Sequence, residues 1–240
     1  MKKLRCLLLI CFFGFSLNAQ SLEVVYGVST ELSLTKEQLE KIPPQIREHY
    51  KQSFKNLKHI KYRLQINDHE SLFKMQESME NEALSGFAFT RIMAGFSGTY
   101  YSNYQKDICL NQTNAFGREF IISSKMSNMI WQLSKEQKTI KDFKVYKASG
   151  FETIKNNSGE HEISIIAWYT PEINLPFGPA NYGNLPGLIL ELERNKKTYT
   201  IENIQDKENI KIEKPSKGKQ VTHAEFEEIG ARVMKNLGSN

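Results

Sequence analysis

Two patterns in this sequence contain residue types that could perform hydrolytic chemistry. Gly95-Phe96-Ser97-Gly98 is similar to the nucleophile elbow of serine hydrolases, but it is one residue too short and lacks a strand-to-helix setting. Glu160 with Glu162, and Glu191 with Glu193, stand two apart on predicted strands. Each pair therefore shares one face and could supply an acid and a base. Acids usually lie in solvent, so an exposed face is the favoured interpretation of both pairs.

Metal and thiol chemistry lack the spacing that they need. None of the five histidines is paired at the four-residue helical spacing of a zinc site, and there is no cluster of cysteines. Cys109 lies between Ile108 and Leu110 with no histidine nearby, so we expect a buried thiol and not a nucleophile. Phosphate-binding and dinucleotide-binding loops are also absent from the sequence. We therefore expect no metal and no cofactor.

The N-terminus has the three parts of a secretory signal. A basic start is followed by an apolar run of roughly a dozen residues and then by Ala19 before Gln20. The run is shorter than the ~20 residues that a spanning helix needs. We expect residues 1–19 to be a cleaved signal peptide and residues 20–240 to form one domain without a transmembrane segment. The expected location is the periplasm, the outer membrane surface or the medium.

Removing the predicted signal changes the charge of the chain. The whole sequence has 32 basic and 27 acidic residues, which gives +5. Residues 1–19 hold three of the basic residues and no acid, so the remainder carries 29 minus 27, or +2. A strong basic excess is the electrostatic mark of nucleic-acid binding. We therefore expect no nucleic-acid partner.

The spacing of apolar residues predicts an α+β fold. Residues 35–57 and the C-terminal residues from Thr222 onward have capping boxes and helical spacing. Residues 59–66 alternate apolar and polar, as a half-buried strand does. Residues 76–97 are expected to be mostly a loop. The other predicted strands are 71–75, 99–104, 107–111, 119–123, 129–133, 144–149, 163–169, 188–193 and 198–204. We expect a single curved, mostly antiparallel sheet of seven to nine strands, with an N-terminal helical segment and a C-terminal helix packed on it.

The passage from Trp168 to Ile189 is the most unusual part of the chain. It holds four of the seven prolines and three glycines, which indicates a rigid, shaped connection. The residues of the motif are Gly178, Pro179, Asn184, Leu185, Pro186, Gly187, Leu188 and Ile189. In this order, after Trp168 and Glu172-Ile173, they resemble the GLPGLI family, small exported proteins of Gram-negative bacteria. Asn184 stands where that family has its first Gly, and Asn tolerates the left-handed conformation best among other residues.

The resemblance covers about residues 58–204 and implies an exported β-rich protein, but no reaction and no catalytic residue. One interpretation of the motif is structural: Pro186-Gly187 redirects the chain into a buried strand. The other is functional: Trp168, Phe177, Tyr182 and Leu185 bind a ligand or partner. We expect a non-enzymatic periplasmic or cell-envelope protein that binds an apolar ligand or an outer-membrane or other envelope protein. The alternative is a secreted hydrolase with dispersed catalytic residues.

Overall fold

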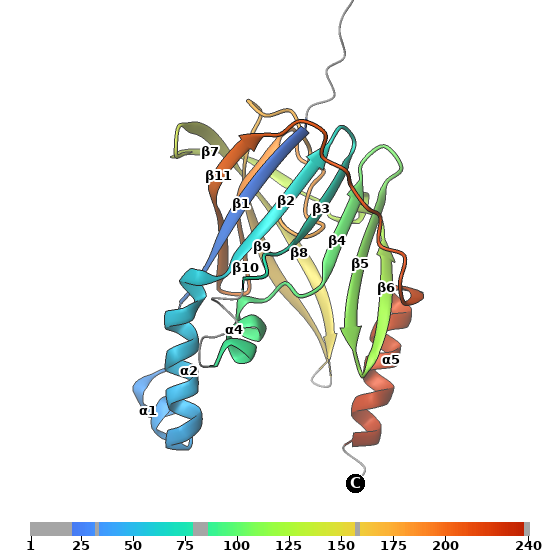
Figure 1. The fold of residues 1–240 in the computed structure, drawn as a ribbon. Helices are drawn as coiled ribbons and strands as arrows, with labels where there is room; N and C mark the ends of the chain where they lie inside the picture. Colours follow the sequence, from blue (N-terminus) through green and yellow to red (C-terminus); the bar gives the residue numbers. More distant parts are fainter. Residues whose placement is uncertain (1–20, 32–33, 79–85, 157–158, 238–240) are drawn as a thin grey trace, which may run out of the picture.

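The computed structural model describes residues 21–31, 34–78, 86–156 and 159–237. The predicted signal peptide, residues 1–19, lies outside the described residues. Strands from Ser21 to Thr222 join one sheet, with the order β12-β6-β5-β4-β3-β2-β1-β11-β10-β9-β8-β7. The sheet curves strongly, so that strands from its two ends face each other (Figure 1).

The sheet contains twelve strands, more than the seven to nine that we expected. All neighbours are antiparallel except β12 and β6, which run parallel. The strands are β1 (Ser21–Thr30), β2 (Lys61–Asn67), β3 (Glu70–Met75), β4 (Thr99–Asn103), β5 (Ile108–Ala115), β6 (Arg118–Ser124), β7 (Gln132–Ile140), β8 (Phe143–Asn156), β9 (Gly159–Thr170), β10 (Leu188–Arg194), β11 (Lys197–Asp206) and β12 (Lys219–Thr222). The unpredicted ones are β1 and β12, at opposite ends of the chain.

Alternation of side chains determines which face of each strand is buried. In β2, Tyr62, Leu64 and Ile66 are fully buried, as their period of two predicts. Strand β1 has the same pattern, with Val24 and Tyr26 fully buried, and it lies between β2 and β11. These side chains belong to one large core on the concave face of the sheet.

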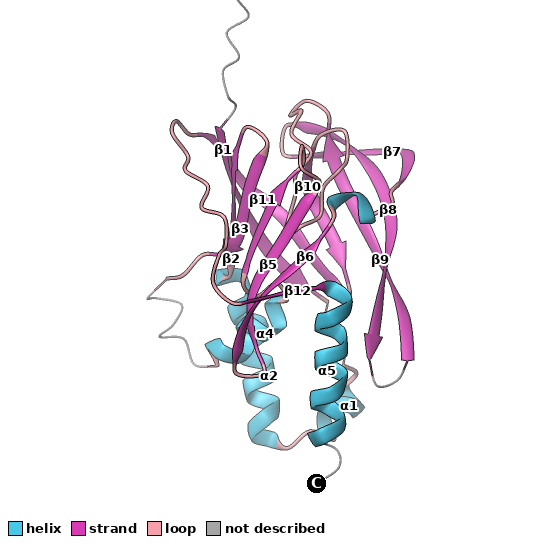
Figure 2. Cartoon of the chain, turned by 90° about the vertical axis from the view of Figure 1, so that its right-hand side faces the viewer, coloured by secondary structure: helices cyan, strands magenta, loops and turns pink. Residues whose placement is uncertain are grey.

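The helices are α1 (Lys36–Glu40), α2 (Pro44–Asn56), α4 (Phe87–Ala94) and α5 (His223–Leu237), with short 3₁₀ turns η1 (Leu57–His59) and η2 (Met126–Asn128). Both predicted capping boxes are present, at Thr35 and at Thr222. The helices extend from one end of the sheet and do not lie across its face (Figure 2). Helix α5 contacts the sheet near its start, where Phe226 packs on Phe120. None of the helices in the described part of the chain is long and apolar enough to cross a membrane.

A loop fills most of the concave face of the sheet. We call residues 171–187, between β9 and β10, the inner loop. Its side chains Ile173, Leu175, Phe177, Ala180 and Leu185 are all buried in the main core. Because of this loop, the helices pack only at one end of the sheet, where α5 contacts β6 and Ala94 of α4 joins the main core.

Two further predictions are wrong in detail. Residues 76–97, expected to be mostly loop, of which 79–85 lie outside the described residues, contain the unpredicted helix α4, which buries Thr90 and Ala94. Its eight residues are too few for a clear helical period, and the flanking glycines, Gly86 and Gly95, both adopt positive φ as turn residues do. The strand predicted at 129–133 begins only at Gln132, because Met129, Ile130 and Trp131 pack against Gly150 of β8.

Candidate functional site

A pocket of about 640 Å³ lies where the two ends of the curved sheet face each other. We call it the edge pocket. One wall comes from β4, β5 and β6, and the opposite wall comes from β8 and β10, with the inner loop and η2 between them. Its lining residues are Gly95, Phe96, Tyr100, Cys109, Asn111, Ile122, Ser124, Lys125, Met126, Asn128, Met129, Phe151, Glu152, Thr153, Ala180, Asn181, Tyr182, Arg194, His223 and Phe226. In Figure 2, β6 and α5 stand on one side and the β8–β9 hairpin on the other.

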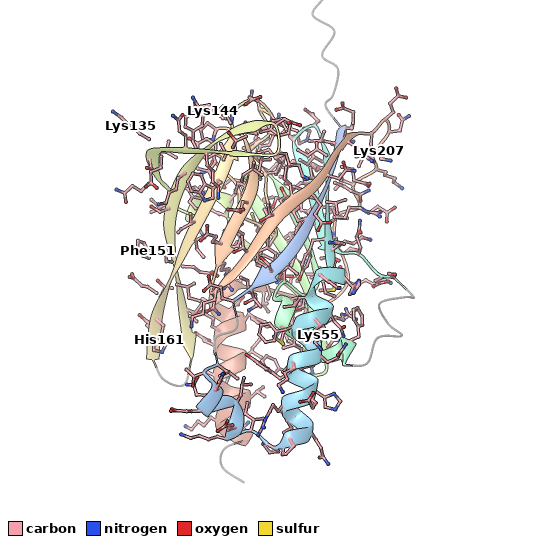
Figure 3. All side chains as sticks on the ribbon, turned by 90° about the vertical axis from the view of Figure 1, so that its left-hand side faces the viewer. Lys55, Lys135, Lys144, Phe151, His161 and Lys207 are labelled. Atoms are coloured by element: carbon pink, nitrogen blue, oxygen red, sulfur yellow. The ribbon has the colours of Figure 1, made fainter. Side chains whose placement is uncertain are left out.

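The outer rim of the edge pocket is partly apolar and exposed. Strand β7 pairs with β8 only as far as Ser149, so Phe151 and Thr153 lie on a part of β8 whose outer edge is unpaired. Figure 3 shows Phe151 and His161 along this projecting hairpin. The side chain of Phe151 is 63% exposed, which is unusual for an aromatic residue of a sheet. Together with Met129 and Phe226, it gives the pocket an apolar entrance.

A polar cluster of three side chains forms the inner wall. Glu152 on β8 accepts hydrogen bonds from the Tyr182 hydroxyl and from Arg194 Nε, each at 2.8 Å. Arg194 Nε also lies 2.8 Å from the Tyr182 oxygen, to which it donates. The ion pair is partly buried, with side-chain exposures of 25% for Arg194 and 29% for Glu152. The cluster connects the inner loop to two strands and places one charged pair in a pocket lined by both apolar and polar residues.

Burial changes the acidity of the phenols around the pocket. It raises the pKa of Tyr182 far above its usual value, and the hydrogen bond to Glu152 acts in the same direction. Burial also raises the pKa of Tyr100 to about 12. Both phenols are therefore neutral at physiological pH and act as hydrogen-bonding groups with apolar rings.

The inner loop is held in one shape by hydrogen bonds to its backbone. Asn184 N donates to Pro176 O at 3.0 Å, Ile189 N donates to Phe177 O at 2.9 Å, and Trp131 Nε1 donates to Gly183 O at 2.8 Å. Asn184 has φ of +62°, so this residue does adopt the left-handed conformation that a Gly would occupy. Gly187 has φ of +145°, and a β-carbon there would overlap the carbonyl oxygen of Thr170. The structural interpretation of Pro186-Gly187, a corner that feeds the buried strand β10, agrees with this geometry.

The structure separates the four predicted binding residues. Phe177 and Leu185 are 1% and 2% exposed and belong to the core, so they do not form part of an external surface. Trp168 lies on the opposite, convex face, where the ammonium of Lys138 is 4.2 Å from the centroid of its ring. Only Tyr182 lines the edge pocket. Gly178 of the motif packs against Ile189 and the carbonyl oxygen of Tyr182, with no space for a side chain.

The other candidate residues, Ser97, Glu191 and Cys109, lie in settings that do not favour catalysis. Ser97 follows helix α4 and precedes β4, the reverse of the setting that a nucleophile elbow needs. Glu191 is bonded to Lys138 and Thr200 on the convex face. Cys109 is buried, as expected, and burial raises the pKa of its thiol to about 11. Such a thiol is a poor nucleophile at neutral pH.

Sequence reasoning missed Glu152 and Arg194, the two charged residues of the inner wall of the pocket. Glu152 lies in a strand that alternates imperfectly, and Arg194 stands at the start of a tight turn, where a basic residue is ordinary. The sequence contains one weak signal for them. A charged residue that stands two positions from a buried residue of the same strand shares its face, as Arg194 does with Leu192.

Comparisons with known proteins bear on the fold. A family model described as a protein of unknown function, Porph_ging, matches residues 151–191, which include the start of the pocket wall, Trp168 and most of the motif. No curated protein matches this chain. Two solved structures of PNGF-II, in space groups C2 and P21, are similar to it, with 15% and 16% identity and a TM-score of 0.51 for each. The matches cover 88% of this chain but only 32% and 33% of PNGF-II, so the chain spans about a third of that protein. At this identity the likeness shows a shared strand-rich fold alone.

Proposed function

We propose that this chain is an exported, non-enzymatic protein of the cell envelope, related to the GLPGLI family, that binds an apolar ligand in the edge pocket. The observation that supports this most is the pocket itself. It is large enough for a small ligand, its entrance is apolar, and it lies between sheet edges that no backbone pairing closes. The match of an uncharacterised family model to residues 151–191 agrees with the proposed relationship.

The shape of the surrounding structure also supports binding. The inner loop is rigid and closes the concave face from inside, so the pocket is preformed on that side. Preformed sites avoid the cost of ordering loops when a ligand enters. Phe151, which is 63% exposed, gains burial when an apolar group occupies the entrance.

Binding of the uncharged dye Nile red to the purified protein tests this proposal. We expect saturable fluorescence enhancement at one site. The double variant Met129→Ser/Phe151→Ser should weaken it at least about tenfold, since two apolar walls of the entrance are lost. The matched control is Leu133→Ser, which removes an exposed apolar residue on β7, outside the pocket. Absence of binding by the native protein, or equal loss in the control, would contradict the proposal.

A hydrolase is the second candidate, and the Tyr182–Glu152–Arg194 cluster is the observation that favours it. A carboxylate held beside a phenol and a guanidinium in a pocket is a typical arrangement for acid–base chemistry. A screen of ester, peptide and glycosidic substrates separates the two functions. Turnover that disappears in Glu152→Gln would establish the hydrolase, and binding without turnover would favour the binding protein.

A further inference from the structure

Two basic side chains are opposed on the hairpin that ends at the edge pocket. Arg194 on β10 and Lys197 on β11 are direct cross-strand partners, joined by a two-residue turn in which Asn195 and Lys196 both have positive φ. Arg194 shares its face with Leu192 and Lys197 shares its face with Tyr199, both buried in the core, so the two basic residues project to the concave side. Like charges directly opposite each other on a sheet are destabilising. This cost needs a compensating partner.

The protein neutralises only one of these two positive charges. Glu152 neutralises one positive charge through Arg194 Nε. Among the residues that the structure describes, Lys197 has no carboxylate within ion-pairing distance, and burial and the charge of Arg194 lower its pKa. The Cδ atom of Lys197 lies beside Gly95, which lines the pocket. One positive charge therefore remains uncompensated beside Gly95, next to the edge pocket although Lys197 is not one of its lining residues.

The guanidinium also has unused donors. The hydrogen bonds of Arg194 to Glu152 and Tyr182 both leave from Nε, and no described protein atom accepts from its two Nη groups. Two parallel N–H donors match the oxygens of a carboxylate or a phosphate. The other lining residues support an anion as well, because Glu152 is the only acid among those that the structure describes, while the exposed Lys125 is basic.

We infer that the edge pocket selects amphipathic anions: an apolar chain lies along Met126, Met129 and Phe151, and its terminal carboxylate or phosphate binds the Nη groups of Arg194 beside Lys197. This inference rests on the proposed binding function and specifies its ligand class. The ligand must combine a charged group with an apolar chain, because the pocket has a basic group on its inner wall and apolar side chains at its entrance.

The test compares two fluorescent ligands that differ only in charge, dansyl-undecanoate and its methyl ester, at concentrations below micelle formation. We expect the native protein to bind the acid at least about tenfold more tightly than the ester. Arg194→Met should remove that preference, and Lys197→Met should reduce it several-fold. Lys196→Met is the matched control, because it removes the same charge from an exposed position of the same turn, outside the pocket. It should keep the preference.

Each outcome has a distinct meaning. Equal binding of acid and ester would overturn the inference and leave the proposed function standing, whereas no binding of either would overturn both. Retention of the preference in Arg194→Met, or its loss in Lys196→Met, would also overturn the inference. If Arg194→Met is unfolded by circular dichroism, Lys197→Met decides, with an unchanged preference counting against us. Competition by dodecanoate and by dodecyl phosphate then distinguishes the carboxylate from the phosphate, and displacement by neither would contradict the assignment.

Discussion

The two faces of the sheet are built from the same strands but are stabilised in different ways. On the concave face, Tyr26, Tyr62 and Tyr199 are almost completely buried in the core to which the inner loop also belongs, and Phe96 packs against Tyr62 and Tyr199. Their hydroxyls still find acceptors: Tyr26 donates to Ile189 O at 2.6 Å, and Tyr199 donates to Ala94 O at 2.8 Å. The face is thus a dry core in which each of these polar groups has a fixed partner.

The convex face depends on charge and aromatic contacts in solvent. Trp168 lies beneath Lys138, whose ammonium also pairs with Glu191 at 2.5 Å, and Lys147 pairs with Glu136 at 3.0 Å. Such contacts are weakened by water and salt. The comparison teaches that the motif's loop and Trp168, though close in sequence, have separate physical roles. Substitutions on the two faces should therefore differ strongly in their effect on stability.

The largest effect is expected for Phe177→Ala on the concave side. This ring is 1% exposed and packs against Tyr104, so its loss should lower the free energy of unfolding by about 3–5 kcal/mol. Urea denaturation measures the change. Phe151→Ala is the control of the same residue type, and at 63% exposure it should change stability by no more than about 0.5 kcal/mol. Similar losses in both variants would show that the inner loop is not part of the core.

Next in size is Gly187→Ala, in the corner of the inner loop. The added methyl group would overlap Thr170 O at a φ that side chains rarely adopt, so we expect a loss of about 2–4 kcal/mol. Gly117→Ala separates the two causes, because Gly117 also has positive φ but has no atom near the new methyl group. It should cost only about 1 kcal/mol. A loss at Gly187 no larger than that at Gly117 would rule out the close approach as the cause.

Alkaline pH should weaken the concave side by a smaller amount. Burial raises the pKa of Tyr100 from 10.0 to about 12. Above pH 10 the unfolded chain therefore releases this proton while the folded chain keeps it, and stability falls until the pH passes about 12. Tyr100 alone should account for about 1 kcal/mol at pH 11. Urea denaturation of native protein and of Tyr100→Phe at pH 9 and 11 measures this. An equal decrease in both would exclude Tyr100 as a cause.

The smallest effect is expected for Lys138→Met on the convex face. It removes a cation over Trp168 and a partly exposed ion pair with Glu191, for a loss of about 0.5–1 kcal/mol that shrinks in high salt. Lys135→Met removes the same charge from an exposed position of the same strand and should be neutral. Comparing melting temperatures at 20 mM and 1 M salt checks this. A loss that high salt leaves unchanged would mean that packing, not charge, holds Trp168 in place.

Local patterns predicted most of the strands, because a period of two is a property of neighbouring residues. The alternation of Tyr62, Leu64 and Ile66 identified β2, and the capping boxes at Thr35 and Thr222 located two helices. Strand β12 was missed because its four residues contain one buried side chain, Val221, and its pairing with β6 joins positions about a hundred residues apart. Nothing local encodes that pairing.

The site was harder to predict than the fold. Tyr182 was identified because the motif around it is dense in proline and glycine. Glu152 and Arg194 meet because β8 and β10 flank β9, on which their cross-strand partners are Ile163 and Ile165. The opposite wall of the pocket, from β4, β5 and β6, approaches them only because the sheet curves. Curvature depends on the sum of many small twists along the sheet. The positions of the strands along the sequence do not give the total twist of the sheet, so the edge pocket could not be predicted from them.

The central position of β1 has a consequence for how the chain reaches its final form. One neighbour of β1, strand β2, follows it closely, but the other, β11, is formed by Lys197–Asp206. During synthesis, Tyr26 therefore cannot pair with its cross-strand partner Ile201 until about 175 more residues have been added. Pairings this distant fold slowly and leave apolar edges uncovered in the meantime. A chain shortened before Lys197 would keep that unsatisfied edge permanently and should aggregate, because the last third of the polypeptide completes the middle of the sheet.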